Sequence, residues 1–172
     1  LIDNPDAEPS DLMAFVKGPD FPTGGLIMGR AGIAEAYRTG KGSIKMRARA
    51  EIVEGKTNDT IVITELPYQV SPNAVFSKIK ELLAAKELDG ISDINDFSSK
   101  GETKIEIKLK RDAPALVVLN NLYKRTPLQT SFSMNAVALV DGVPRTLNLR
   151  ELLVPYIKHQ VEVITRRSQY RL

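Results

Sequence analysis

The stretch "SIKMRARAEIVEGKTNDTIVITEL", residues 43–66, predicts a β-hairpin. Apolar side chains occupy every second position from Ile44 to Ile52, and charged side chains occupy the positions between them. A period of two is typical of a strand that has one face on a core and the other in water. The polar segment 54–59 predicts a turn, and residues 60–66 predict the partner strand.

Outward from this hairpin, the apolar periodicity predicts helices and further strands. Helices are expected at 30–40, 71–88, 112–126 and from 148 to the end, and strands at 26–29, 90–99, 103–111 and 128–148, the last with a turn at "DG". Strand pairs close enough to form hairpins, with helices between them, predict an α+β fold. We expect a mostly antiparallel sheet packed on helices in two layers, followed by a long C-terminal helix.

Residues at the ends of the expected helices support these positions. Gly40 suits the end of the first helix, Ser71 can cap the second, and Asp112 is a possible cap of the third. Asn148 and Glu151 form a capping-box pattern for the last helix.

The opening segment, residues 4–25, is rich in Pro, Gly and Asp and predicts a linker around one short helix. The apolar residues of that helix are Leu12, Phe15 and Val16.

Composition excludes several classes of site. The chain has 172 residues, 42% hydrophobic and 26% charged, which is typical of one soluble globular domain. It has no Cys, so disulfides and Cys-ligated zinc are excluded, and its single histidine, His159, cannot form a His-rich metal site. No apolar run reaches the roughly 18 residues that span a bilayer, and no secretory leader is present, so we expect a cytoplasmic protein without a membrane. The first residue is not Met and the last residues still have a helical pattern, so we expect a piece of a larger protein.

Basic side chains are concentrated in one part of the sequence. The net charge is only +3, but residues 30–49 hold six cations against the single acid Glu35. These six candidate DNA-binding residues are Arg30, Arg38, Lys41, Lys45, Arg47 and Arg49. Such a stretch favours a polyanionic partner, and a solvated face is the alternative.

Strand geometry defines how three of these cations would act. Lys45, Arg47 and Arg49 alternate along one strand, so they would lie about 6–7 Å apart on the same face. That spacing suits phosphate contacts, which fix position without reading bases. No aromatic residue lies between them, which argues against stacking on single-stranded bases. Pairing with Glu51, Glu65 or Glu106 on neighbouring strands is the competing interpretation.

Two catalytic interpretations of the same region fail. A phosphate-binding loop needs Gly, four residues, then Gly-Lys and Ser or Thr, whereas Gly40-Lys41 is followed by Gly42 and follows a helix. A nucleophilic tyrosine would need acid–base help and usually clustered carboxylates. Tyr37 has no such cluster in sequence, and we expect it to be a half-buried packing residue.

Several blocks of the sequence resemble the A subunits of bacterial DNA gyrase and topoisomerase IV, the type IIA DNA topoisomerases, and are nearer to gyrase. The blocks are "GPDFPTGG", "EAYRTGKGS", "ITELPYQV", "KRDA", "NNLYKRTPLQTSF" and "LVDGVPRTLNLRELL", and they follow the family's order over nearly the whole chain. Ser133, where the family commonly has Gly, and Pro114 depart from the usual pattern.

The resemblance implies a division of the chain and a role. It implies a connection from an upstream winged-helix domain at 1–19, a tower region at 20–147 and the start of the coiled-coil gate helix at 148–172. In the family, the tower supports the bent double-stranded DNA that is about to be cut. The family's cleaving tyrosine lies between Arg and Thr, whereas this chain has the order Tyr37-Arg38-Thr39, so no catalytic residue and no metal ligand are carried over.

The resemblance also implies partners and cofactors of the parent complex. The partners are double-stranded DNA, the gyrase B subunit, which brings Mg and ATP, and a second copy of the A subunit. We therefore expect the chain alone to have no cofactor, to neither cleave nor relax DNA, and to be monomeric or weakly self-associating. An independent nucleic-acid-binding module and a purely structural spacer remain alternatives.

Overall fold

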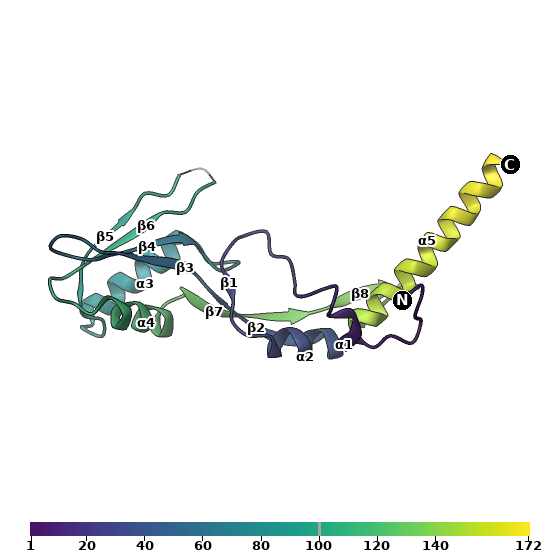
Figure 1. Ribbon diagram of the computed structural model, residues 1–172, viewed down its shortest axis with the longest axis horizontal. Helices are drawn as coiled ribbons and strands as arrows, with labels where there is room; N and C mark the ends of the chain where they lie inside the picture. Colours follow the sequence, from purple (N-terminus) through teal and green to yellow (C-terminus); the bar gives the residue numbers. More distant parts are fainter. Residues whose placement is uncertain (100) are drawn as a thin grey trace. The chain divides into compact units, whose positions relative to one another are not determined.

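The computed structural model describes residues 1–99 and 101–172 as an α+β fold (Figure 1). The helices are α1 (Pro9–Leu12), α2 (Ala31–Thr39), α3 (Pro72–Ala84), α4 (Ala115–Arg125) and α5 (Leu149–Arg171). The strands are β1 (Leu26–Ile27), β2 (Lys41–Arg47), β3 (Arg49–Val53), β4 (Thr60–Glu65), β5 (Ile91–Asp96), β6 (Ile105–Leu109), β7 (Gln129–Asn135), β8 (Val137–Val140) and β9 (Val143–Thr146). The predicted class, antiparallel sheets with helices and a long final helix, is confirmed.

The strands form three sheets, in the orders β1-β2-β7, β3-β4-β6-β5 and β8-β9. Contacts divide the chain into two compact units instead of the single domain expected from its length. Unit 1 contains residues 1–20, 29–44 and 133–172, and unit 2 contains residues 21–28 and 45–132. These bounds differ from the three parts that the family resemblance implies, and that division stays a prediction.

Unit 2 is built on the sheet β3-β4-β6-β5, with α3 and α4 on one of its faces (Figure 1). Ile61, Ile63, Ile105, Ile107 and Leu109 are fully buried and point from the central strands to these helices. The helices contribute their own apolar stripes, which include Val75, Ile79, Val118 and Leu122. The strand expected at 103–111 is confirmed as β6, and its apolar residues Ile105, Ile107 and Leu109 belong to this core.

The predicted hairpin forms, but its first strand is shorter than expected. Strand β3 pairs antiparallel with β4, whereas residues 41–47 belong to a different strand, β2, which pairs with β1. The break falls at Ala48, which is fully buried. Its N–H donates to the carbonyl of Leu128 at 2.7 Å, and its carbonyl accepts from the hydroxyl of Tyr123 at 3.3 Å. These partners come from distant sequence, so the alternation of residues 44–52 could not reveal the break.

Unit 1 joins short elements to a long helix. Helix α1 contacts both α2 and α5, and the Nη2 of Arg150 on α5 donates to the carbonyl of Pro5 at 2.9 Å. Residues of α5 beyond Leu149 are half-buried or exposed. The exposed apolar residues on it include Val154, Tyr156, Val161, Val163 and Ile164.

Most predicted helix ends are confirmed. The Ser71 hydroxyl accepts from the N–H of Ala74, and Asn148 and Glu151 form both hydrogen bonds of a capping box. Gly40 ends α2 in the left-handed conformation, with φ of 77°.

Two predicted details are wrong. Asp112 does not cap α4, because its own backbone is left-handed (φ 59°) and Pro114 stands at the cap position instead. Helix α1 ends at Leu12, so Phe15 lies beyond it and is 86% exposed rather than part of an apolar helical face.

The region 128–148 contains the predicted turn, but two strands precede this turn instead of one. β7 ends at Asn135 and β8 begins at Val137, where a single strand was expected. Asp141 and Gly142 have φ of 50° and 77°, as an Asp-Gly turn of a tight hairpin requires. The turn joins β8 to β9 in register, with Val140 opposite Val143.

Candidate nucleic-acid interface

The basic residues of unit 1 are exposed at the two ends of α2. Arg30 stands at the N-cap position, Arg38 lies in the last turn, and Lys41 opens strand β2 just after the helix. All three side chains are exposed, and none takes part in an ion pair within residues 1–99 and 101–172. They are therefore free to bind an external anion.

The turn between α2 and β2 is fixed by backbone contacts. The N–H of Gly40 donates to the carbonyl of Ala36 at 2.8 Å. The Thr39 hydroxyl oxygen lies 2.9 Å from the carbonyl oxygen of Glu35 and 2.8 Å from that of Lys41, so its one proton donates to one of them, and it accepts from the N–H of Lys41 at 3.2 Å. A Cβ added at Gly40 would lie 2.6 Å from the carbonyl oxygen of Leu147, so only glycine fits there. This geometry supports a helix stop and not a phosphate-binding loop.

Tyr37 packs inside unit 1. It is 5% exposed on the buried face of α2, together with Ile33 and Ala36. Burial raises the pKa of its phenol, which disfavours the phenolate that a nucleophile needs. The interpretation of Tyr37 as a packing residue is confirmed, and the residue is more deeply buried than expected.

Two cations of unit 2 on strand β2 differ strongly in their surroundings. Lys45 is exposed, and its backbone carbonyl accepts from the N–H of Met28 at 2.8 Å. Arg47 is half-buried, and its Nε and Nη2 donate to Oε1 of Gln129 at 2.9 and 2.6 Å. Its guanidinium carbon also lies 4.4 Å from the centre of the Tyr123 ring, a cation–π distance. Arg47 therefore connects β2 to α4 and β7.

Arg49 is the first residue of β3 and stands opposite Glu65 of β4. Its Nε lies 3.1 Å from Oε1 of Glu65, and both side chains stay partly exposed, at 48% and 36%. The other carboxylate oxygen of Glu65 accepts from the backbone N–H of Gly25. This N–H and the Arg49 guanidinium hold the pKa of Glu65 below its usual range. The competing pairing proposed from sequence is thus present for Arg49 with Glu65.

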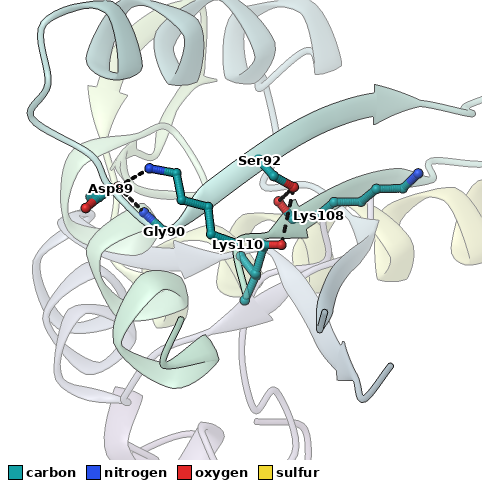
Figure 2. Close-up of polar contacts among 6 residues, drawn as sticks. Asp89, Gly90, Ser92, Lys108 and Lys110 are labelled. Carbon is teal, nitrogen blue, oxygen red and sulfur yellow. Dashed lines mark hydrogen bonds and ion pairs between the residues drawn. The ribbon is translucent and has the colours of Figure 1, made fainter. Parts of the chain in front are cut away.

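A second group of lysines lies on the outer side of β6 and is mostly neutralised. Lys104 pairs with Glu106 at 3.0 Å, and Lys110 pairs with Asp89 at 2.6 Å. Figure 2 shows the Asp89 carboxylate between Lys110 and the N–H of Gly90, whereas the Lys108 side chain extends away from these contacts. Lys108 is exposed and joins none of the ion pairs of the described residues.

Other kinds of site find no support in the described ranges. Within residues 1–99 and 101–172, no three His, Cys, Asp or Glu side chains gather as the ligands of a metal ion would. His159 is exposed on α5. In the same part of the chain, no helix combines the length and apolarity that a membrane span requires.

The six predicted residues are therefore distributed over both units. Arg30, Arg38 and Lys41 belong to unit 1, and Lys45, Arg47 and Arg49 belong to unit 2. Sequence reasoning missed the roles of Gln129 and Tyr123, because residues so far apart in sequence carry no local signal of contact.

Comparison with known proteins identifies the chain's relatives. Residues 1–172 match the family of the A subunits of DNA gyrase/topoisomerase IV. The whole chain aligns with the DNA gyrase A subunit of Pseudomonas aeruginosa at 51% identity and with that of Staphylococcus epidermidis at 49%. It also aligns with the DNA gyrase A subunit of Staphylococcus aureus at 51% identity. The chain spans about one fifth of these relatives, 19% to 20% of their length. The chain belongs to the family of DNA gyrase/topoisomerase IV A subunits.

Proposed function

We propose that the chain is the tower segment of a gyrase A subunit, which holds a bent DNA duplex by its phosphates during ATP-dependent supercoiling. The supporting observation is the set of exposed cations within residues 30–49, in a chain that matches the family from end to end. Bending a duplex requires neutralisation of phosphates near the bend and no reading of bases. Exposed Lys and Arg side chains on a rigid turn and strand supply that contact.

Within this function the six basic residues have different roles. Arg30, Arg38, Lys41 and Lys45 contact phosphates directly, because their side chains are exposed and outside the ion pairs of the described residues. Arg49 contacts phosphate in competition with Glu65. Arg47 holds the strand in place, because its guanidinium already contacts Gln129 and Tyr123.

In the parent complex, the chain acts together with subunits that supply the chemistry. The partners are the B subunit, which provides Mg and ATP, and a second copy of the A subunit. The chain itself has no cleaving tyrosine in the family's Arg-Tyr-Thr order. It therefore binds DNA without cutting it. The equivalent segment of topoisomerase IV is the nearest alternative, and the gyrase names of the three relatives above favour gyrase.

A salt titration tests the DNA contact. The 172-residue chain is titrated with a short mixed-sequence duplex at about 50 and 200 mM salt, where each phosphate contact changes the affinity ratio by about 3.5-fold (slope about −0.9). Lys41→Ala and Lys45→Ala should each reduce the salt slope by roughly 0.9, and equally for any duplex sequence. Binding that is independent of salt and of both lysines would reject the function in favour of a structural spacer.

An activity assay tests the absence of cutting. Supercoiled plasmid is incubated with the pure chain, with and without magnesium and ATP. We expect no relaxation and no linear or nicked product, and relaxation that follows the chain through purification would contradict the assignment.

A further inference from the structure

We infer that Glu65 is a built-in competitor of DNA for Arg49, a fixed carboxylate that limits the affinity of this part of the surface for phosphate. The inference rests on the proposed function, because it concerns how tightly the DNA-binding surface holds its ligand. All the residues concerned, Gly24, Gly25, Arg49 and Glu65, belong to unit 2.

The carboxylate is fixed in place by the glycine segment that precedes β1. The N–H of Gly25 donates to Glu65 Oε2 at 2.5 Å. A Cβ added at Gly24 would lie 2.5 Å from that same oxygen, and Gly25 has φ of 102°, which favours glycine. Two adjacent glycines therefore let the backbone approach the carboxylate closely. The Gly25 hydrogen bond therefore holds the Glu65 carboxylate beside Arg49.

Arg49 remains able to reach an external anion. Its contact with Glu65 is made through Nε, and a guanidinium carries further N–H donors on its two terminal nitrogens. The side chain is 48% exposed, so a phosphate can approach those nitrogens. The adjacent carboxylate offsets the charge of Arg49. The pair therefore contributes less to counterion release than a free arginine.

The exposed lysine nearest in sequence provides a contrast within the same unit. Lys45 is exposed and outside the ion pairs of the described residues. At Arg49, by contrast, the Gly25 hydrogen bond and the guanidinium lower the pKa of Glu65, so the competing charge is present at neutral pH. A surface that must release its duplex after each cycle gains from one weakened contact.

Glu65→Gln tests the inference, because glutamine can still accept the N–H of Gly25 but carries no charge. The matched control is Glu51→Gln on β3, an exposed position of the same sheet with the same change in net charge. DNA affinity is measured at about 50 and 200 mM salt. We expect Glu65→Gln to bind several-fold more tightly at the lower salt and to steepen the slope by up to about 0.9, and Glu51→Gln to leave the slope unchanged.

A double variant identifies Arg49 as the group that is released. In the Arg49→Ala background, Glu65→Gln should give no more gain than Glu51→Gln gives. Equal gains from both Gln variants, or a Glu65→Gln gain that persists without Arg49, would overturn the inference. A loss of affinity in Glu65→Gln would also overturn it, since Glu65 would then position Arg49 for DNA instead of competing.

A second variant keeps the test informative if Glu65→Gln does not fold. In Arg49→Lys, the single ammonium stays with Glu65 and has no separate fork to offer a phosphate. We expect this variant to bind DNA more weakly than the parent, and binding equal to the parent would contradict the inference. If the lysine variants of the proposed function weaken binding but the Glu65 variants behave like their control, only this inference fails.

Discussion

Apart from the exposed Lys45 of unit 2, the candidate basic residues of the two units differ in what surrounds them. In unit 1, Arg30, Arg38 and Lys41 lie at the ends of a short helix, exposed and outside the ion pairs of the described residues. In unit 2, Arg47 contacts Gln129 and Tyr123, and Arg49 contacts Glu65. Cations that look equivalent in sequence thus fall into two groups, one available to a ligand and one already engaged with the protein.

This difference shows that a cation's exposure and partners, not its place in a charged run, decide what it does. Removing an exposed lysine costs little stability, whereas removing a half-buried arginine leaves its acceptor and ring without a partner. Replacing an exposed cation should therefore lower DNA affinity and leave stability unchanged, whereas replacing the half-buried Arg47 should lower stability.

The largest expected effect is on stability and comes from Arg47. Arg47→Ala removes two hydrogen bonds to Gln129 and the contact with the Tyr123 ring, so we expect a loss of about 2–3 kcal/mol in the free energy of unfolding. Arg47→Lys keeps the charge but not the fork and should recover only part of this loss. Urea unfolding measures the difference, with Lys45→Ala as the exposed control. Surface substitutions usually change the free energy of unfolding by less than about 0.5 kcal/mol. A loss that small for Arg47→Ala would show that Arg47 does not differ from the exposed cations.

The next effect is on DNA affinity and comes from the exposed lysines. Lys41→Ala should weaken binding and change the ratio of affinities at about 50 and 200 mM salt by about 3.5-fold, with no change in stability. Lys56→Ala, in the exposed turn between β3 and β4, is the control for loss of one charge outside the stretch. Equal salt slopes for Lys41→Ala and Lys56→Ala would show that net charge, and not this surface, binds the duplex.

A smaller effect concerns the pH dependence of stability. The folded state lowers the pKa of Glu65 from its usual 4.5, so the ionised carboxylate stabilises the fold above that value. The stabilisation should be lost as the pH falls from about 4.5 through the lower folded pKa. Thermal melts of the parent and Glu65→Gln should therefore differ at neutral pH and converge in acid. A difference that stays constant across this range would assign the effect to packing and not to charge.

The smallest effect is expected at the exposed pair of Lys110 and Asp89, whose side chains are 57% and 87% exposed. Lys110 and the N–H of Gly90 lower the pKa of Asp89, but water screens the pair. Asp89→Asn should change neither the melting temperature nor the DNA affinity measurably. If Asp89→Asn raised DNA affinity as much as Glu65→Gln, the effect of Glu65 would be a general effect of charge.

Local patterns predicted most of the fold and part of the candidate site. The caps at Ser71 and Asn148, the left-handed Gly40 and the inward-facing Ile105 and Ile107 follow from short-range rules, because each depends on neighbours within a few residues. The same rules predicted the α+β class and the exposed positions of the lysines.

Long-range contacts explain what the sequence did not reveal. The break between β2 and β3 at Ala48 depends on hydrogen bonds to Leu128 and Tyr123. The guanidinium of Arg47 is held by Gln129, 82 positions away. The pairing of Arg49 with Glu65 was foreseen as an alternative, but only the strand register selects it among the three acids considered.

The failed cap at Asp112 has a local cause. Its left-handed backbone, followed by Pro114 at the cap position, shifts the start of α4 to Ala115. A short polar residue before a helix is therefore an incomplete signal when a proline stands between it and the first helical turn.

The fully buried Ala48 between the two arginines makes this segment intolerant of changes in length. Its N–H and its carbonyl are both bonded to partners from outside the segment, so the backbone is fixed at this point from both sides. Inserting or deleting one residue beside it would rotate every following side chain to the opposite face of the strand. Arg49 would then face the core, and Ala50 would face water. In a library of variants, point changes at 45 and 49 should survive, whereas single-residue insertions between them should disappear.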